Sequence, residues 1–255
     1  MKNLAYDLGN KNDLQSDISA AYQSREVSPF PSIENRQETD AIAQECAVAL
    51  VYNGISHAVM MASPIDLEAL AVGFSFTEGI IEQRHEIYDI QIQEHPQGIE
   101  VLIELASERF TQLKSRRRQL TGRTGCGLCG LESLQQVHNE ITPVKNNCKI
   151  KNDTIQKALV NLPKWQPLQK LTGATHAAAM CDQAGKIIMA MEDVGRHNAL
   201  DKLIGAQLLT GTKPTGFVLI SSRASFEMVQ KTARAGFEIL VAVSAATQLA
   251  IDVAH

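Results

Sequence analysis

The sequence contains no long apolar run, few aromatic residues and no strong excess of charge of either sign. Aromatic residues make up 5% of its 255 residues, and no stretch approaches the roughly 20 consecutive apolar residues that a bilayer-spanning helix requires. Met1 to Leu4 lead into polar sequence and not into the apolar region of a signal peptide. We therefore expect a cytoplasmic protein with no membrane association, whose 44% hydrophobic content suffices for one large core or two modest ones.

The net charge is only −4, from 24 basic and 28 acidic side chains. This balance does not favour a broad nucleic-acid-binding surface, so no nucleic acid is expected as a partner. Basic residues are dense in one segment only, which contains Arg109, Lys114, Arg116, Arg117, Arg118 and Arg123. That segment fits either a solvated helix face or an electrostatic aid to the loop that follows it.

A regular cysteine framework is also absent. The chain has five cysteines, an odd number, so a secreted disulfide scaffold is not expected. Cys46 and Cys181 lie among apolar residues and are predicted to be small core residues, whereas Cys148 lies in a polar stretch and receives no role. The other two cysteines form a C-x-x-C pair.

This pair, Cys126 and Cys129, lies in a loop in which three glycines alternate with the cysteines and leucine. Glycine removes side-chain bulk and permits conformations that other residues avoid, so we expect accessible sulfur atoms. Arg123 lies close in sequence, and nearby positive charge favours the reactive thiolate. The loop is therefore the predicted working site of the protein.

Three functions compete for the pair. Half of a structural zinc site would need two more ligands, and only scattered candidates exist: His138, Cys148, His176 and His197. A thioredoxin-like dithiol would follow a strand directly, whereas an arginine-rich segment precedes this pair. In sulfur carriage, one thiolate holds a persulfide and the second protects it or helps to release its sulfur. Chemistry alone leaves redox exchange and sulfur carriage equally supported.

Residues 1–40 lack apolar periodicity and contain turn-forming residues, so we predict a mobile N-terminal arm. Residues 41–120 are predicted to form a smaller mixed α/β domain. Asn53-Gly54 favours a hairpin turn, and Ser63 is expected to cap a helix that runs to about Ile81. The strands expected in this domain span 48–52, 55–61, 90–92 and 99–105.

Residues 121–255 are predicted to form a second domain with the C-x-x-C loop at its start. We expect helices at 154–162, 196–209 and 225–236, and strands at 175–181, 186–191, 217–220 and 239–243. The last two strands and the helix between them form a βαβ unit. This order predicts a three-layer α/β domain with helices on both faces of one sheet.

Polar motifs follow several of these strands or begin the helices. In open α/β sheets, anionic ligands dock at such positions, so the motifs are candidates for one pocket that holds phosphate and nucleobase groups. The candidate ligand-binding residues are His176, Arg196, His197, Ser222, Arg223 and Ser225. Taken singly, His176 also fits a hydrogen-bonded structural histidine and Ser225 a helix N-cap. Neither a G-x-G-x-x-G motif nor a P-loop is present.

Taken together, these motifs closely resemble the FdhD family of formate dehydrogenase accessory sulfurtransferases. The resemblance begins near residue 45 and extends to the C-terminus. It rests on the segments Val51–His57, Gly122–Gly130, Thr175–Ala179, Glu192–His197 and Ser221–Ser225. The set is far more specific than a lone C-x-x-C pair.

The resemblance implies that Cys126 receives persulfide sulfur from a cysteine desulfurase, with Cys129 assisting. The sulfur would pass to the molybdenum bis(guanine dinucleotide) cofactor, bound at the candidate pocket, before that cofactor enters formate dehydrogenase. The resemblance also implies a homodimer and a cytidine-deaminase-like second domain. The H-x-E and P-C-x-x-C signature of zinc deaminases is missing, so we expect neither base deamination nor catalytic zinc.

One departure concerns the end of the chain. Members of the family continue after the helix at 245–247 into another strand and a loop with glycine and arginine, so we expect the second domain to be short at its C-terminus. Two alternatives to sulfur transfer stay open: a dithiol redox protein, and a chaperone that binds the cofactor and delivers it without carrying sulfur.

Overall fold

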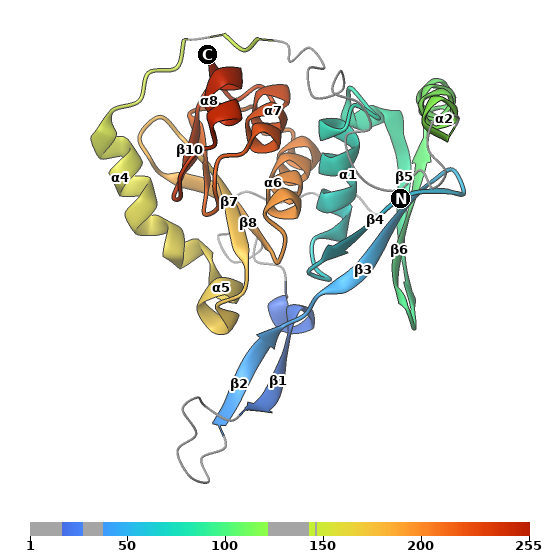
Figure 1. Cartoon of the computed structure of the whole chain (residues 1–255), viewed down its shortest axis with the longest axis horizontal. Coiled ribbons are helices and arrows are strands. Elements are labelled where there is room, and N and C mark those ends of the chain that lie inside the picture. The colour runs from blue at the N-terminus through green and yellow to red at the C-terminus, as the bar shows by residue number, and fades with distance from the viewer. Residues whose placement is uncertain (1–16, 28–37, 122–142, 146) are drawn as a thin grey trace.

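The computed structural model describes residues 17–27, 38–121, 143–145 and 147–255, with side chains placed except at 116–121. The structure has two four-stranded sheets, with helices packed between them (Figure 1), and a separate two-stranded sheet. The C-x-x-C pair Cys126 and Cys129 lies outside the described residues, as do Arg123 and His138.

The first sheet has the strand order β4-β3-β6-β5. Its strands are β3 (Cys46–Tyr52), β4 (Ile55–Ala62), β5 (Ile87–His95) and β6 (Gly98–Leu105). Two antiparallel hairpins are joined by the parallel pair β3–β6. Asn53 and Gly54 both have positive φ, 45° and 78°, which is the conformation that a tight hairpin turn requires. The hairpin predicted at Asn53-Gly54 is confirmed, and the strands predicted at 90–92 and 99–105 pair as a second hairpin.

Helix α1 (Leu67–Thr77) covers the core face of this sheet. The predicted cap and end of this helix are wrong. Asp66 holds the N-cap position with φ 53° and makes no side-chain cap, whereas Ser63 is completely buried and its N–H donates to Asp193 Oδ2 at 3.0 Å. Ser63 thus bonds to a residue of the second sheet and not to its own helix, and its local sequence does not reveal this long-range partner. The helix ends early because Gly79 turns the chain with φ 70°.

The second sheet has the strand order β10-β9-β7-β8. Its strands are β7 (His176–Cys181), β8 (Ile187–Asp193), β9 (Phe217–Ile220) and β10 (Leu240–Ala242). Strand β7 pairs antiparallel with β8 and β9, whereas β9 and β10 are parallel. The strands predicted at 175–181 and 186–191 therefore pair as a hairpin, and the predicted βαβ unit is confirmed.

Helices cover both faces of the second sheet, as predicted. One face carries α6 (Arg196–Thr210) and α7 (Phe226–Arg234). The other carries α4 (Asn152–Asn161) and the short η3 (Leu162–Trp165), which α5 (Pro167–Thr172) follows in the chain. Alternate residues of β7 face the two layers: Met180 packs with the α6 side and Ala179 with the α4 side.

The two sheets are connected through the contact between α1 and α6. A Cβ added at Gly73 of α1 would lie 1.8 Å from the Asp201 carbonyl oxygen, and one added at Gly205 of α6 would lie 1.8 Å from the Ala69 carbonyl oxygen. The helix backbones therefore touch, and only glycine fits at both positions. The layers follow the order first sheet, α1, α6, second sheet, α4 (Figure 1).

The expectation that residues 1–40 lack regular structure is wrong in part. The structure has η1 (Ile18–Ala21) and an antiparallel pair formed by β1 (Tyr22–Val27) and β2 (Glu38–Ala43), which extends away from the layers (Figure 1). Most side chains of this pair are exposed, so no alternation of apolar and polar residues announced it. Ala21 anchors its base against Ile65 and Leu168.

The remaining described helices are η2 (Arg84–Glu86), α2 (Ser107–Thr121) and α8 (Gln248–Ala254). The predicted boundary between the two domains falls at the end of α2 and stays a prediction. Within the described ranges, no helix combines the length and apolar character needed to cross a membrane.

Candidate functional site

Three helices begin at one edge of the second sheet. Because β8, β9 and β10 run in the same direction, their carboxyl ends meet there together with the start of β7. Helices α6, α7 and α8 follow these strands directly, so their first turns lie at the same edge (Figure 1). We call this region, built from residues 193–197, 221–225 and 243–247 with His176, the strand-end edge. Helix N-termini present unpaired N–H groups and suit anions.

His176 and Arg196 lie together at this edge. His176 begins β7 directly opposite Asp193, and Arg196 is the first residue of α6. Burial lowers the pKa of His176, and the positive charge of Arg196 lowers it further. Arg196 Nε is buried and has no hydrogen-bond partner among the described residues. A buried donor of this kind is rare and is consistent with a missing ligand.

The loop after β9 supplies three more candidates. Ser221 fixes it to the start of β7, because its Oγ accepts from the Ala177 N–H at 2.9 Å and its N–H donates to the Ala177 carbonyl. Ser222 is buried and its hydroxyl donates to the Arg223 carbonyl at 3.3 Å, whereas Arg223 is exposed. Ser225 occupies the N-cap position of α7 but makes no side-chain cap, and its Oγ is buried without a partner in the described structure.

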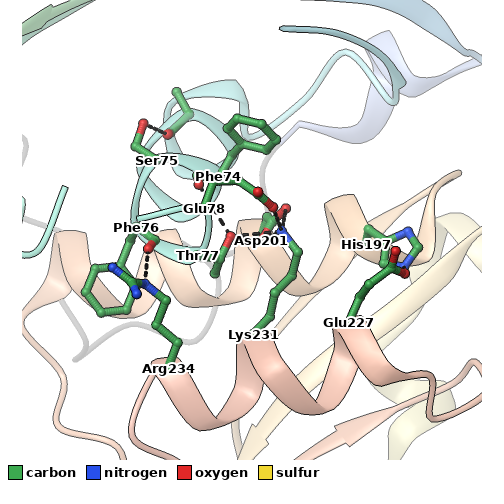
Figure 2. A network of polar contacts seen from close by, with 11 residues as sticks. Phe74, Ser75, Phe76, Thr77, Glu78, His197, Asp201, Glu227, Lys231 and Arg234 are labelled. Atoms are coloured by element: carbon green, nitrogen blue, oxygen red, sulfur yellow. Dashed lines mark hydrogen bonds and ion pairs between the residues drawn. The ribbon is translucent and has the colours of Figure 1, made fainter. Parts of the chain in front are cut away.

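His197 is oriented differently from the other candidates. Its Nε2 lies 2.8 Å from Glu227 Oε2 of α7, and Figure 2 shows the two side chains facing each other between α6 and α7. No hydrogen bond joins the two groups in the described structure, and the negative charge of Glu227 acts on the imidazole across this short distance. Burial lowers the pKa of His197, although Glu227 opposes this. His197 therefore joins two helices of the site.

A buried polar network, which sequence reasoning missed, holds α7 in place. Lys231 Nζ lies 3.0 and 2.9 Å from the two carboxylate oxygens of Asp201 and 2.9 Å from both Glu78 Oε1 and Thr77 Oγ1 (Figure 2). Burial raises the pKa of Asp201 and opposes charge on Lys231, but the two carboxylates outweigh this and raise the Lys231 pKa. The sequence did contain a signal for this network. Lys231 follows the buried Met228 by three residues in the amphipathic α7, a spacing that places both on the same face of the helix.

The acidic residues of the Glu192–Asn198 motif support the site from behind. Asp193 accepts four hydrogen bonds or ion contacts, from Ser63 N–H, Gly195 N–H, Asn198 Nδ2 and the fully buried Lys202, whose Nζ lies 2.7 Å away. Glu192 accepts from two backbone N–H groups at the start of α5 and from a threonine hydroxyl. Both carboxylates are thus occupied, and they position the strand-end edge.

The three described cysteines are poor nucleophiles. Burial raises the pKa of Cys46 and Cys148, and it raises the pKa of Cys181 to about 12, so all three are mainly protonated at neutral pH. Cys46 donates to the Ala62 carbonyl, and Cys181 is a core residue as predicted. Among the described side chains, no three His, Cys, Asp or Glu gather as metal ligands.

The comparisons with known proteins agree with the motifs. The model of the FdhD/NarQ family matches residues 43–255. The chain belongs to this family. A relative from Cupriavidus necator, the sulfur carrier protein FdhD, is 55% identical over 217 residues, which cover 85% of this chain and 75% of that protein.

The fold comparison gives the same result. A crystal structure described as a formate dehydrogenase accessory protein from Desulfotalea psychrophila superimposes with a TM-score of 0.68 over 91% of this chain and 87% of that chain. At 24% identity this likeness supports the fold alone. The predicted membership of the FdhD/NarQ family and the α/β fold class are confirmed, whereas the individual site residues stay predictions.

Proposed function

We propose that this protein is a sulfur carrier that serves the maturation of formate dehydrogenase, with Cys126 as the sulfur-carrying residue. The observation that carries the proposal is the 55% identity to a protein named sulfur carrier protein FdhD. The FdhD/NarQ match spans both the C-x-x-C pair and the strand-end edge. The protein would act as a sulfurtransferase in the cytoplasm.

The proposed loading step is an exchange at sulfur. The Cys126 thiolate attacks the terminal sulfur of a persulfide on a cysteine desulfurase, so that Cys126 gains a persulfide and the donor leaves as a thiolate. For release, the Cys129 thiolate attacks the inner sulfur of this persulfide. Hydrosulfide leaves toward the acceptor, and a Cys126–Cys129 disulfide remains, which a cellular dithiol reductant resets.

The proposed acceptor is the molybdenum bis(guanine dinucleotide) cofactor, which we treat as substrate. Its phosphates need cationic and N–H donors, and the strand-end edge offers the starts of α6 and α7, exposed Arg223 and the unpartnered Arg196 Nε. The unpartnered Ser225 hydroxyl is a further donor. The donor set therefore fits an anionic nucleotide.

Sulfur loading tests the role of Cys126. Incubation of the protein with a cysteine desulfurase and cysteine should add the mass of one sulfur atom, as read by intact mass spectrometry, and Cys126→Ala should prevent this. Cys46→Ala is the matched control, because Cys46 is half-buried and its raised pKa keeps it protonated. Equal loading of Cys126→Ala and wild type would refute the assignment.

Acceptor binding is tested separately. Arg196→Gln and Ser225→Ala should still load sulfur but bind guanosine monophosphate, used as a probe for half of each dinucleotide, about tenfold more weakly, since each loses a polar contact to the ligand. Arg84→Gln, at η2 beside the first sheet, is the control. Unchanged nucleotide binding by both variants would remove the strand-end edge as acceptor site.

Complementation separates the remaining alternatives. A chaperone that only delivers the cofactor would still restore formate dehydrogenase activity in cells when it carries Cys126→Ala. A dithiol redox protein would need both cysteines yet would add no sulfur in the loading assay. The homodimer stays a prediction, which sedimentation of the purified protein can test.

A further inference from the structure

Strand β8 is an unguarded sheet edge. It is the last strand in the order β10-β9-β7-β8, and in the described part of the chain no strand pairs with its outer side. Ile187 to Met191 are five consecutive apolar residues with no charge or proline. Natural proteins usually protect a free edge with charges, prolines or a covering segment. Strand β8 therefore offers a template for a further strand.

The register shows which backbone groups are free. The Ala177 carbonyl in β7 accepts from the residue that follows β9, so the neighbours of Ala177 in β7 bond to β8 instead. Of these neighbours, Ala178 lies opposite Met191, so the backbone groups of Met191 face β7. The N–H and C=O groups of Ala190, which precedes Met191 in β8, consequently point to the free edge.

A groove runs along this edge. Its volume is about 630 Å³, a size typical of ligand sites. Opposite β8, the groove is lined by Ile18 of η1, Ile65, Trp165 of η3 and Pro167 of α5. In an extended peptide every second side chain points the same way, so an added strand could place alternate apolar side chains between these residues.

The charge at the groove is predominantly positive. Lys157, Lys164 and Lys186 line it and are exposed. Lys157 donates to a backbone carbonyl oxygen and Lys164 to a side-chain amide oxygen. Both acceptors are neutral, so these bonds do not compensate the positive charges. The lining contains two acidic residues, Asp66 and Glu192. Glu192 is buried and already accepts three hydrogen bonds, so the three lysines outnumber the acidic side chains that face the groove.

We propose that this β8 groove binds an extended, acidic segment of a partner protein, which adds a strand to β8. Main-chain hydrogen bonds to Ala190 would supply affinity, and the lysines would select acidic partners. Strand β8 ends at Asp193, where the strand-end edge begins, so the bound partner lies beside that edge. The inference goes beyond the proposed sulfur transfer and does not depend on it.

The protein carries its own reporter for this test. Trp165 is its only tryptophan and it lines the groove. The full chain is titrated with a short synthetic peptide that alternates Glu and Val. The fluorescence of Trp165 should change until the binding site is saturated, and added salt should weaken the binding. A peptide that alternates Lys and Val should not saturate.

Two kinds of variant test the mode of binding. Ala190→Pro removes one N–H at the free edge without removing a bond to β7, and it should weaken binding of the acidic peptide about tenfold or more. Lys164→Glu with Lys186→Glu should weaken it by at least about tenfold as well. Lys149→Glu with Lys170→Glu, at exposed lysines outside the groove, should leave it unchanged.

The outcomes against the proposal are equally definite. The proposal is overturned if the two peptides bind with equal affinity. It is also overturned if the acidic peptide binds the variant Lys164→Glu with Lys186→Glu as tightly as it binds wild type. This second test holds even where Ala190→Pro fails to fold. It is also overturned if wild type sediments as a dimer that Ala190→Pro converts to a monomer, because β8 then pairs with a second copy of the chain.

Discussion

At the scale of single residues, burial decides the charge of the site more than sequence neighbours do. His176 and His197 are both partly buried and close to Arg196, and both have lowered pKa values. Asp193, in contrast, is fully buried yet receives four donors. Burial and the charge of Arg196 therefore both favour the neutral form of the two histidines.

The two histidines should make stability depend on pH. In the unfolded chain their pKa is near 6.5, whereas the folded protein keeps them neutral to lower pH. Below about pH 6.5 the unfolded state binds more protons, so the free energy of unfolding should fall as pH falls and be fully restored above that pH. Urea denaturation at about pH 5.5 and about pH 7.5 measures this difference.

The variant His176→Gln with His197→Gln should show a smaller difference between the two pH values than wild type. His95→Gln is the control, because the His95 side chain is exposed on the first sheet. If the double variant keeps the full dependence of wild type, other groups cause it.

At the scale of elements, the crossing of α1 and α6 is the tightest contact described. Gly73 and Gly205 let the two backbones touch, and Lys231 from α7 reaches Asp201 of α6 and Glu78 after α1 at the same junction. The first turns of α6 and α7 therefore rest on a fixed base. Ligand-binding helix N-termini need such support to keep their donors oriented.

Substitution at this crossing should be costly. Gly73→Ala and Gly205→Ala each place a Cβ 1.8 Å from a carbonyl oxygen, so the helices must separate, and we expect a loss of about 3 kcal/mol despite the better helix propensity of alanine. Gly211→Ala meets no atom within 4 Å and should cost only about 1 kcal/mol for its positive φ. Chemical denaturation compares the three variants, and equal losses would contradict this account.

At the scale of the whole molecule, the layers form one connected stack. Helices α1 and α6 join the two sheets, and Ser63 from the loop after β4 bonds directly to Asp193 and Lys202 of the second sheet and its helix. The β1–β2 pair is the exception, because it projects from the stack (Figure 1). Folding of one sheet therefore depends on the other.

This arrangement predicts a single unfolding transition. Trp165 reports on the second sheet, and amide exchange of β3 and β6 reports on the first, so their unfolding midpoints in urea should coincide. Separate midpoints would show that residues 41–120 and 121–255 unfold as independent domains. Amides of β1 should exchange earlier, because its side chains are largely exposed.

The sequence by itself determined the local elements and the family. Asn53-Gly54, the apolar alternation of the strands and the glycine after α6 act over a few residues, so their effects could be derived without the fold. The motifs identified the FdhD/NarQ family because spaced residue types survive as a pattern in the chain.

Only the tertiary structure decided which polar residues are buried and bonded within the protein. Ser63 was expected to cap a helix and Lys231 received no role, but both are buried and bonded to residues more than a hundred positions away. Glu192 and Asp193 belong to a motif that carries the family resemblance, and their carboxylates hold the strand-end edge together. Burial and long-range hydrogen bonding depend on which elements pack together, and a local sequence pattern does not contain that information.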